Sequence, residues 1–500
     1  MKKSVRILSA LLVLLLLALF VACQPNGTPS QTDNKGTAGT QSGDESQYVA
    51  DYLPTDTYDG RSFRVGIWGA EGSYDIQVED TTNTIDKAVY ERNLLIEERY
   101  DIDIKEVKVA DSYDDAFYAY QTYFQSSEDV YDICKQIMRN AWLAAVGGMV
   151  LPVDQLPYCD TEQEWYLKYV NEALEINDTL FFAYTYEADT VIRALMAVFF
   201  NKSILADLQN VEDPYQLVKD GSWTIDKMHE IAMKARNDVN GDGEYSIDDD
   251  VYGVISENDM YVPSMWVGAG MKLIEKDEEL GMPYFAASGN EKFLDILNKT
   301  YSYYTMDNLV FDGFTMIGHK TETIAEDVKY FTQNHSLFYM GGIYQWESMT
   351  DMEADFGLLP LPKYDEAQQT YYSRVCDGHA NCVPFVNPDL SFTSVILEAL
   401  AVESLNIYVP AYFEDAIENR YLRDPEQSME IVKMMQANTI VDLGDSIWIS
   451  YMRNPVVQCF IDERPIFSST FEKNASTINT VISGDLEKLA LVIEALNGVS

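Results

Sequence analysis

Residues 63–68 read FRVGIW, a stretch that predicts a buried first strand running into a glycine-containing loop. A helix is expected next, because Thr84 can cap its start and apolar residues recur at helical spacing over 85–100. Residues 102–109 alternate as a second strand, and residues 130–134 read as a third. This order of strand, helix and strand predicts an α/β fold with mostly parallel sheets flanked by helices.

The chain is long enough for more than one such unit. Its 500 residues exceed what one hydrophobic core supports, so two lobes are expected. Further strands are predicted at 194–200, 337–340 and 355–362, and the chain from 390 onward reads as mostly helical. Because no second low-complexity linker separates two halves, we expect the lobes to be interleaved, with a ligand cleft between them. The expected lobes are residues 49–189 with 331–385, and residues 190–330 with 386–500.

Composition excludes several classes of protein. A hydrophobic content of 47% indicates a globular chain rather than a disordered one. Lys and Arg number 35 against 81 Asp and Glu, and the net charge of -46 argues against nucleic acid and anionic lipid surfaces as partners. Four His and six Cys leave little room for a zinc cluster or a disulfide-knotted fold.

The first residues predict an export signal. Lys2, Lys3 and Arg6 precede an apolar run over 7–22, shorter than the roughly 20 residues a spanning helix needs. Residues 1–22 are therefore expected to be a signal peptide. The Val-Ala-Cys that ends at Cys23 resembles the bacterial lipobox, which implies that Cys23 is lipidated and becomes the first mature residue. An uncleaved N-terminal anchor is the alternative.

Residues 23–48 are expected to form a flexible linker. The stretch is rich in Gly, Ser, Thr, Asn and Asp and has almost no aliphatic residue to bury. A chain of this length spans about 25–30 Å end to end. A lipid on Cys23 followed by this tether predicts a bacterial lipoprotein at the extracellular face of the cell membrane, with membrane contact only through the anchor.

A series of short motifs carries a family resemblance. In chain order these are AVYERN at 88–93, IEERY at 96–100, FFNK at 199–202, GSWTID at 221–226, FYMGG at 338–342 and GLLPLPKY at 357–364. In this order the sequence resembles an extracellular solute-binding protein of an ABC importer, of the carbohydrate class with the type II periplasmic-binding fold. The resemblance implies a monomeric two-lobed clamp that closes on a sugar or oligosaccharide and delivers it to ABC permease subunits in the membrane.

The sharpest local motif is DVNGDGEYSIDD at 238–249, which matches most of the EF-hand calcium-loop pattern. The predicted calcium ligands are Asp238, Asn240, Asp242, the Glu244 carbonyl and Asp249, which stands where the pattern usually has Glu. A helix enters this loop but a strand leaves it, so the expected Ca²⁺ is structural rather than part of a sensor. An acidic hairpin without metal is the alternative.

Sugars present apolar C–H faces and a rim of hydroxyl groups, so their sites pair flat aromatic rings with carboxylates and amides. We select candidates that lie at the ends of expected strands, at the first crossing between lobes or near an expected helix start. These ligand-binding candidates are Trp68, Glu71, Tyr186, Glu187, Trp266, Tyr344, Trp346 and Asp377. Tyr344 and Trp346 follow Gly341-Gly342, where the resemblance implies a sugar-stacking aromatic. Core packing is the alternative for each of these residues.

Two other functional classes were weighed. A secreted glycosidase could use paired carboxylates on the same sugars, and a surface adhesin could share the predicted location. The sequence contains no Gly-x-Ser-x-Gly elbow and no P-loop, and Met233 stands where a zinc-binding HExxH motif needs its second His. We therefore expect a binding protein that works by hinge closure, with no chemical step and no catalytic residues.

Overall fold

The computed structural model describes residues 48–69, 76–78, 81–126, 128–186, 190–277, 279–316, 323–375, 378–418 and 421–498. The expected signal peptide, Cys23 and the linker up to residue 47 lie outside the described residues. Tyr48, expected as the last linker residue, is already held by the body. Its backbone N–H donates to Asn406 Oδ1 and its carbonyl accepts from Asn406 Nδ2, each at 2.9 Å.

The first lobe is built on a five-stranded sheet in the order β2-β1-β3-β13-β4. Its strands are β1 (Arg61–Trp68), β2 (Ile102–Ala110), β3 (Ile133–Ile137), β4 (Val150–Leu151) and β13 (His379–Pro384). β1 pairs in parallel with β2 and β3, whereas β13 runs antiparallel to β3 and β4. The strands predicted at 63–68 and 102–109 are confirmed, and the third begins at Ile133 rather than at residue 130.

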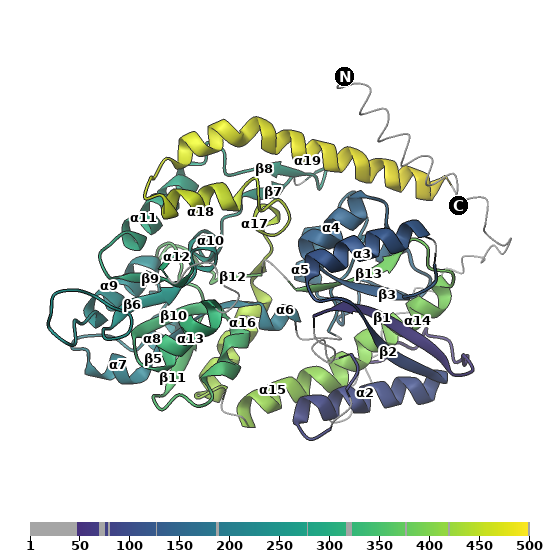
Figure 1. Cartoon of the computed structure of the whole chain (residues 1–500), viewed down its shortest axis with the longest axis horizontal. Helices are drawn as coiled ribbons and strands as arrows, with labels where there is room; N and C mark the ends of the chain where they lie inside the picture. The colour runs from purple at the N-terminus through teal and green to yellow at the C-terminus, as the bar shows by residue number, and fades with distance from the viewer. Residues whose placement is uncertain are drawn as a thin grey trace.

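Helices cover both faces of the first sheet (Figure 1). They are α2 (Thr84–Tyr100), α3 (Tyr113–Ser126), α4 (Met138–Val146), α5 (Lys168–Leu174), α14 (Leu390–Glu403) and α15 (Val409–Glu418), with the short turns η2 (Val153–Gln155) and η4 (Ser404–Tyr408). α2 is capped by Asn83, one residue before the predicted cap, because the Asn83 side chain accepts from Asp86 N at 2.7 Å. The continuous helix 390–415 is long and apolar enough to cross a membrane, but 72% of its apolar window is buried inside the protein, as in a core helix.

The second lobe is built on another five-stranded sheet, in the order β11-β5-β10-β6-β9. Its strands are β5 (Met196–Asn201), β6 (Tyr252–Ser256), β9 (Val310–Asp312), β10 (Ser336–Gly342) and β11 (Phe356–Leu359). β6 pairs in parallel with β9 and β10, and β5 runs antiparallel to β10 and β11. Both lobes are thus α/β units with mostly parallel sheets flanked by helices, as the sequence predicts.

The remaining elements surround this second sheet and connect the lobes (Figure 1). The helices are α6 (Thr190–Arg193), α7 (Lys202–Asp207), α8 (Pro214–Lys219), α9 (Ile225–Ala235), α10 (Asn258–Gly268), α11 (Glu291–Tyr304), α12 (Gly313–Met316), α13 (Thr323–Thr332), η3 (Ile343–Met349), α16 (Pro425–Ala437), α17 (Leu443–Ser446), α18 (Arg453–Ile461) and α19 (Phe467–Asn497). Two small sheets pair β7 (Ile274–Lys276) with β8 (Pro283–Phe285), and β12 (Ser373–Arg374) with β14 (Thr439–Ile440).

The predicted lobe boundaries need correction at two places. β10 and β11 fall within 331–385, which was expected in the first lobe, yet both pair with β5 in the second sheet. α14, expected in the second lobe, packs on α2 of the first. Hydrophobic periodicity predicts that a segment is a strand or a helix, but not which partner covers it, and this explains both differences.

The long helix α19 joins the two lobes along one side of the molecule (Figure 1). It packs on α11, α18 and β8 in the second lobe and on α4 in the first. Asp485 on α19 accepts from the indole N–H of Trp142 at 3.3 Å and of Trp448 at 3.0 Å, and these two rings lie edge to face at 5.2 Å. The Asp485 carboxylate thus binds two indole groups, that of Trp142 on α4 and that of Trp448 just after α17.

The segments that connect the lobes are fixed by a buried ion pair. Arg374 on β12 donates to both carboxylate oxygens of Asp445, at 2.6 and 2.9 Å, and each side chain is only 1% exposed. Arg453 approaches the same carboxylate at 3.5 Å. Removing one partner of such a pair leaves a buried charge without compensation, which is strongly destabilising.

The described cysteines form no disulfide with one another. Cys134, Cys159, Cys382 and Cys459 are all free thiols, although Cys134 and Cys382 lie opposite each other on β3 and β13. Burial raises the pKa of both thiols, which keeps them protonated. Cys376 lies outside the described residues.

We predict that Arg374→Ala lowers the free energy of unfolding by about 3–5 kcal/mol, because the buried Asp445 then loses its bidentate partner and keeps only Arg453 at 3.5 Å. Urea unfolding followed by circular dichroism would measure the change. Lys87→Ala is the matched control, since Lys87 makes an exposed ion pair with Glu91 at 3.8 Å and should change stability by less than about 0.5 kcal/mol. A loss from Arg374→Ala no larger than that of the control would contradict the assignment.

Candidate functional site

Aromatic side chains form one wall of the candidate site, at the carboxyl edge of the first sheet. Trp68 ends β1, and its half-buried ring lies edge to face with Tyr113 at 5.5 Å and with His379 at 5.2 Å. The guanidinium of Arg139 lies 4.6 Å from the centre of the Tyr113 ring. Such contacts hold a ring at a defined angle. We call Trp68, Tyr113 and His379 the aromatic wall.

His379 belongs to this wall as a neutral side chain. Burial, together with the nearby cations Lys135 and Arg193, lowers its pKa to about 3. The imidazole therefore carries no charge at neutral pH. Arg193 lies on α6, in the segment that crosses from the first lobe to the second, so the wall faces the start of the connection between lobes.

The start of this crossing segment is tied to the first sheet through Asn381 on β13. Asn381 exchanges two backbone hydrogen bonds with Ala183, at 2.8 and 3.2 Å. Its side chain accepts from Lys135 Nζ at 2.7 Å and donates to Thr185 Oγ1 at 3.2 Å. All three of the side chains involved are buried, so the chain leaves the first lobe from a fixed position.

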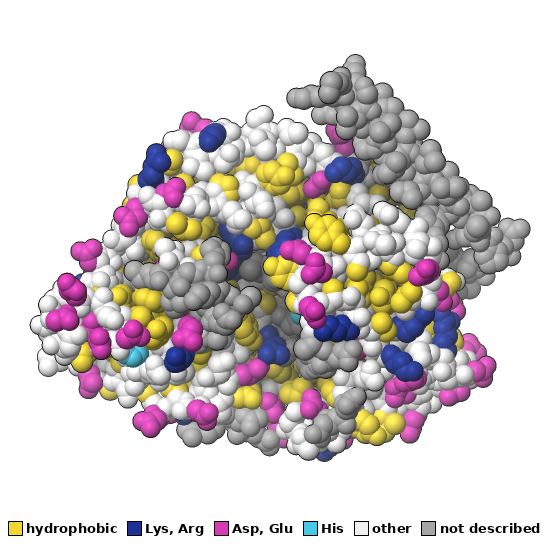
Figure 2. Space-filling model, in the orientation of Figure 1, with side chains coloured by type: hydrophobic (Ala, Val, Ile, Leu, Met, Phe, Trp, Pro, Cys, Tyr) yellow, Lys and Arg dark blue, Asp and Glu magenta, His cyan; other side chains and the backbone are white. Residues whose placement is uncertain are grey.

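The carboxyl edge of the second sheet lies at the other end of the same crossing. β5 begins at Met196, which pairs with Gly342 at the end of β10. Arg193 makes an ion pair with Glu347 on η3 at 2.9 Å. Because Arg193 also lies near His379, the carboxyl edges of the two sheets meet beside Arg193. Figure 2 shows a recess between the lobes on this face, with acidic and basic side chains around it.

Tyr344 lies at the carboxyl edge of the second sheet. A Cβ atom at Gly342 would lie 2.5 Å from its ring, so glycine is needed there for the half-buried Tyr344 to take this place. The Tyr339 hydroxyl lies close by, and burial raises its pKa, with Tyr344, Asp327 and Glu257 adding to the effect. A tyrosine and several carboxyl groups are therefore gathered at this edge.

Carboxyl groups surround the ends of β6 and β9. Asp312 is well satisfied, since it accepts from the backbone and side-chain N–H groups of Asn258, each at 3.0 Å, and from Tyr304 OH at 2.6 Å. Asp327 on α13 is different. It is 1% exposed, and neither of its carboxylate oxygens has a hydrogen-bond partner. Gly313 makes its position available, because a Cβ atom there would clash with the Asp327 carboxylate.

Two neighbours complete this group. Glu257, directly after β6, is 7% exposed, and burial together with Asp259 and Asp312 raises its pKa to about 7. Asp259 in the first turn of α10 has one buried oxygen without a partner and lies 3.9 Å from Arg453. Burial, Glu257, Asp312 and Glu326 together raise the pKa of Asp327 to about 8. We call Glu257, Asp259 and Asp327 the acidic cluster.

The predicted ligand-binding residues fall into three groups. Trp68 and Tyr344 lie at the two carboxyl edges, and Tyr186 is half-buried at the start of the crossing, where burial raises its pKa to about 12. Glu71, Glu187 and Asp377 lie outside the described residues. Whether any of these side chains contacts a ligand stays a prediction.

Trp266 and Trp346 require correction, because both are fully buried. Trp266 lies inside α10 (Asn258–Gly268), and its indole N–H donates to Asp442 at 3.2 Å. Trp346 packs against the rings of Tyr412 and Tyr421, at 5.9 and 6.4 Å. Core packing, the alternative stated for both, is what the structure shows.

The acidic cluster was missed at the sequence level. One signal was available: Glu257 and Asp312 each follow or end a run of apolar residues that reads as a strand. Nothing in the sequence indicated that Asp327, 70 positions after Glu257, would lie beside it. The pairing of β6 with β9, and the packing of α12 on α13, bring them together.

The predicted calcium loop has the expected backbone turns but a different set of inward side chains. Gly241 and Gly243 have φ of 73° and 82°, and Asp238 accepts from their two N–H groups at 2.7 and 2.9 Å. Asn240 accepts from Asp242 N and Asp242 from Glu244 N, at 2.9 and 2.8 Å, as in Asx turns. The helix α9 enters this loop and the strand β6 follows it, as predicted.

Asp249, the predicted last ligand, is exposed, and the acidic side chain that points inward at the end of the loop is that of Asp250. Asp250 is fully buried and accepts from Val239 N and Ser246 N, each at 2.9 Å, across the loop. In the part of the chain that the structure describes, no three His, Cys, Asp or Glu side chains are grouped so as to hold a metal ion.

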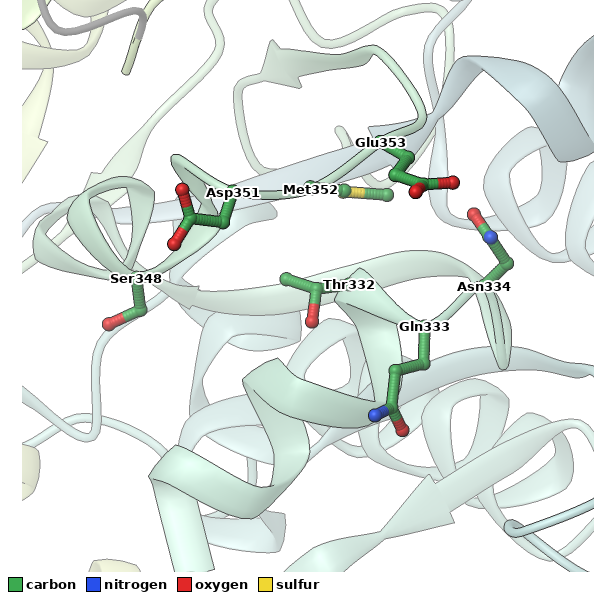
Figure 3. A pocket seen from close by; sticks show the side chains of 7 residues that line it. All are labelled: Thr332, Gln333, Asn334, Ser348, Asp351, Met352 and Glu353. Carbon is green, nitrogen blue, oxygen red and sulfur yellow. The ribbon is translucent and has the colours of Figure 1, made fainter.

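A separate pocket of about 380 Å³ lies at the opposite edge of the second sheet (Figure 3). Thr332, Gln333 and Asn334 at the end of α13 line one side, and Ser348, Asp351, Met352 and Glu353 line the other. These residues precede β10 and β11, so the pocket is at the amino ends of these strands, away from the crossing. It shares no residue with the aromatic wall or the acidic cluster.

Known proteins were compared with this chain. No protein-family model and no curated protein matches the sequence. The chain is similar in structure to the ABC substrate-binding protein from Listeria monocytogenes in complex with cycloalternan, with a TM-score of 0.53 at 12% identity over 85% of this chain and 100% of that one. It is also similar to maltose-bound MalE3 of T. maritima, with a TM-score of 0.51 at 13% identity over 87% of this chain and 100% of that one. An ABC transporter solute binding protein from Thermotoga lettingae bound with alpha-D-tagatose gives a TM-score of 0.51 at 13% identity, over 85% of this chain and 100% of that one. These comparisons establish that the chain has the fold of ABC solute-binding proteins.

We predict that Asp327→Asn stabilises the protein at pH 8 and that this gain shrinks as the pH falls towards 4. The folded-state pKa of Asp327 is raised to about 8 from 3.8. The folded state therefore binds a proton that the unfolded state releases, and stability falls as the pH rises through this window. Urea unfolding at pH 8, 7, 6 and 5 would measure it.

Asp312→Asn is the matched control for this prediction. It removes a carboxylate that accepts several hydrogen bonds, so it should destabilise the protein at each of these pH values. If Asp327→Asn has the same effect as Asp312→Asn, the unpartnered state of Asp327 is wrong.

Proposed function

We propose that this chain is an extracellular solute-binding protein that captures a sugar or oligosaccharide between its lobes and delivers it to an ABC-type permease. The observation that carries the proposal is the meeting of the two carboxyl edges beside Arg193. It places the aromatic wall of one lobe and the tyrosine and carboxyl groups of the other beside the same crossing. The structural neighbours bound with cycloalternan, maltose and tagatose support the same ligand class.

The mechanism is capture by hinge closure. In the open form the aromatic wall offers a flat apolar surface to the C–H face of a sugar ring, and the opposite edge offers hydroxyl and carboxyl groups to its hydroxyls. Closure brings the two edges together and removes water from both. No bond is made or broken, and the closed form docks on the permease as a monomer.

A thermal-shift screen of the chain from Gln24 onward would test this function. The panel holds cycloalternan, maltose, longer maltooligosaccharides, tagatose and the common monosaccharides. A ligand at 100 times its dissociation constant should stabilise the protein by about 2.7 kcal/mol. A saturable shift without sugar turnover supports the proposal. Turnover would reassign the chain to the glycosidases, and a folded protein that no sugar shifts would contradict it.

The aromatic residues at the two edges give a more specific prediction. Trp68→Ala and Tyr344→Ala should each weaken binding of the best ligand by about 10- to 100-fold, because each removes a ring from the ligand surface. Isothermal titration calorimetry would measure the dissociation constants. Trp346→Phe, at a buried ring away from the edge, should leave the affinity unchanged. A dissociation constant equal to that of the parent protein in Trp68→Ala and Tyr344→Ala would exclude both residues.

We place the protein at the extracellular face of the cell membrane, anchored through a lipid on Cys23. The proposal is supported by the lipobox-like sequence and by the Gly- and Ser-rich stretch up to Tyr48, where the described body begins. Replacing Cys23 by Ser should move the mature protein from the membrane fraction to the medium, as detected by immunoblotting. Retention of the variant in the membrane fraction would favour an uncleaved anchor.

We also propose that the 238–250 loop binds a structural Ca²⁺, with Asp250 in place of Asp249 as the last ligand. The sequence pattern and the two positive-φ glycines support it. Millimolar calcium should then raise the melting temperature. Asp238→Ala and Asp242→Ala should each abolish that shift, whereas Asp249→Ala should preserve it. A calcium shift that survives both of the first two substitutions would place the ion elsewhere.

A further inference from the structure

The acidic cluster contains more carboxyl groups than its surroundings pair with cations or hydrogen-bond donors. Among the described residues Asp259 has one ion pair, with Arg453 at 3.9 Å, whereas Glu257 and Asp327 have none. Asp327 also has no hydrogen-bond donor, although it is 1% exposed. A buried carboxyl group without a donor costs free energy, and native proteins rarely leave one in that state.

The position of the cluster points to a ligand. Glu257 and Asp259 follow β6, and Asp327 rests on Gly313 directly after β9, so all three lie at the carboxyl edge that the second sheet presents to the crossing. Tyr339 and Tyr344 lie beside them. Asp312 lies at the same edge, but its carboxylate accepts hydrogen bonds from Asn258 and Tyr304 and so requires no further donor. The unmet requirement is therefore specific to the three residues of the cluster.

An ammonium group meets this requirement better than a neutral hydroxyl or a metal ion. It donates three hydrogen bonds, and its positive charge favours the ionised form of two carboxyl groups that burial and mutual repulsion otherwise keep protonated. A metal ion would need several oxygen ligands converging on one point, and no three acidic side chains of the described residues do so, whereas two carboxyl groups suffice for an ammonium. A neutral sugar hydroxyl would supply a donor and leave the mutual repulsion of the carboxylates in place. The overall net charge of -46 attracts a cationic ligand at long range as well.

We propose that the ligand of this protein carries a protonated amine, as in an amino sugar, and that Glu257 and Asp327 bind that group, with Asp259 beside them. The inference rests on the proposed function, because it takes the crossing between the lobes as the place where a sugar binds. It deepens that function by naming the chemical class of the ligand.

The test compares sugars that differ only in one substituent. Glucosamine, galactosamine, mannosamine and oligomers of glucosamine form the amine series. The hydroxyl series is the corresponding neutral sugars, and the acetamide series is their N-acetyl derivatives. Titration calorimetry with the soluble chain at pH 6.5, in buffer with chelator, gives a dissociation constant for each. We expect at least one amine to bind tenfold or more tightly than its hydroxyl and acetamide counterparts.

The variants identify the residues responsible. Asp327→Asn and Glu257→Gln should each weaken amine binding by about tenfold or more, and weaken any neutral sugar by less than about threefold. Asp351→Asn, an acidic residue in the separate pocket of Figure 3, should change neither. Circular dichroism of each variant confirms that it is folded.

Each of the other outcomes contradicts one specific claim: the amine ligand, the residues assigned to it, or the proposed function. Neutral sugars that bind as tightly as every amine would refute the amine proposal and leave the proposed function standing. Tight amine binding that survives both cluster variants would refute the assigned residues. If binding appears only when a divalent cation replaces the chelator, the cluster holds a metal instead. If no sugar of any series binds to the folded protein, both proposals fail.

Discussion

The direction of two strands determines where the lobes of this protein meet. Each sheet contains one strand by which the chain enters from the other lobe, β5 in the second sheet and β13 in the first, and each runs against its parallel neighbours. An entering strand that runs antiparallel begins where its neighbours end. Met196 therefore lies opposite Gly342, and His379 opposite Ile137. Both connections are forced onto carboxyl edges, which is where α/β sheets bind ligands.

The chemistry at the two edges is complementary rather than alike. The first lobe contributes rings held by edge-to-face contacts around a neutral imidazole. The second contributes carboxyl groups that are buried, close together and only partly satisfied. Arg193 lies between the two sets, near His379 and paired with Glu347 at 2.9 Å. A ligand that bridges the lobes would thus have one apolar face and one polar or charged face.

Local patterns in the sequence predicted the elements, and the family resemblance predicted their arrangement. The stretch at 63–68, the helix after it and the loop between α9 and β6 are all found near their expected bounds. The errors concern relations between distant segments. The apolar character of 337–340 identifies a strand but does not say that it pairs with β5, and an indole such as Trp266 looks the same in a sequence whether it faces a ligand or a core.

The acidic cluster illustrates the same limit most clearly. Its members come from β6, α10 and α13, and only the pairing of strands and the packing of helices bring them together. Asp249 and Asp250 differ by a single position, yet one is exposed and the other fully buried. A pattern of residue types shows that a carboxylate is available in this loop. Only the folded backbone shows which of two adjacent carboxylates points inward.

Finally, α19 limits the mechanical freedom of the molecule. Its 31 residues span both lobes, and Asp485 joins Trp142 to Trp448 along one side. A helix resists bending and stretching, so lobes that keep both attachments cannot slide apart or separate along its length. The motion left to them is a hinge rotation about an axis near that side. The far margins of the lobes then travel furthest, while the atoms beside the helix barely move.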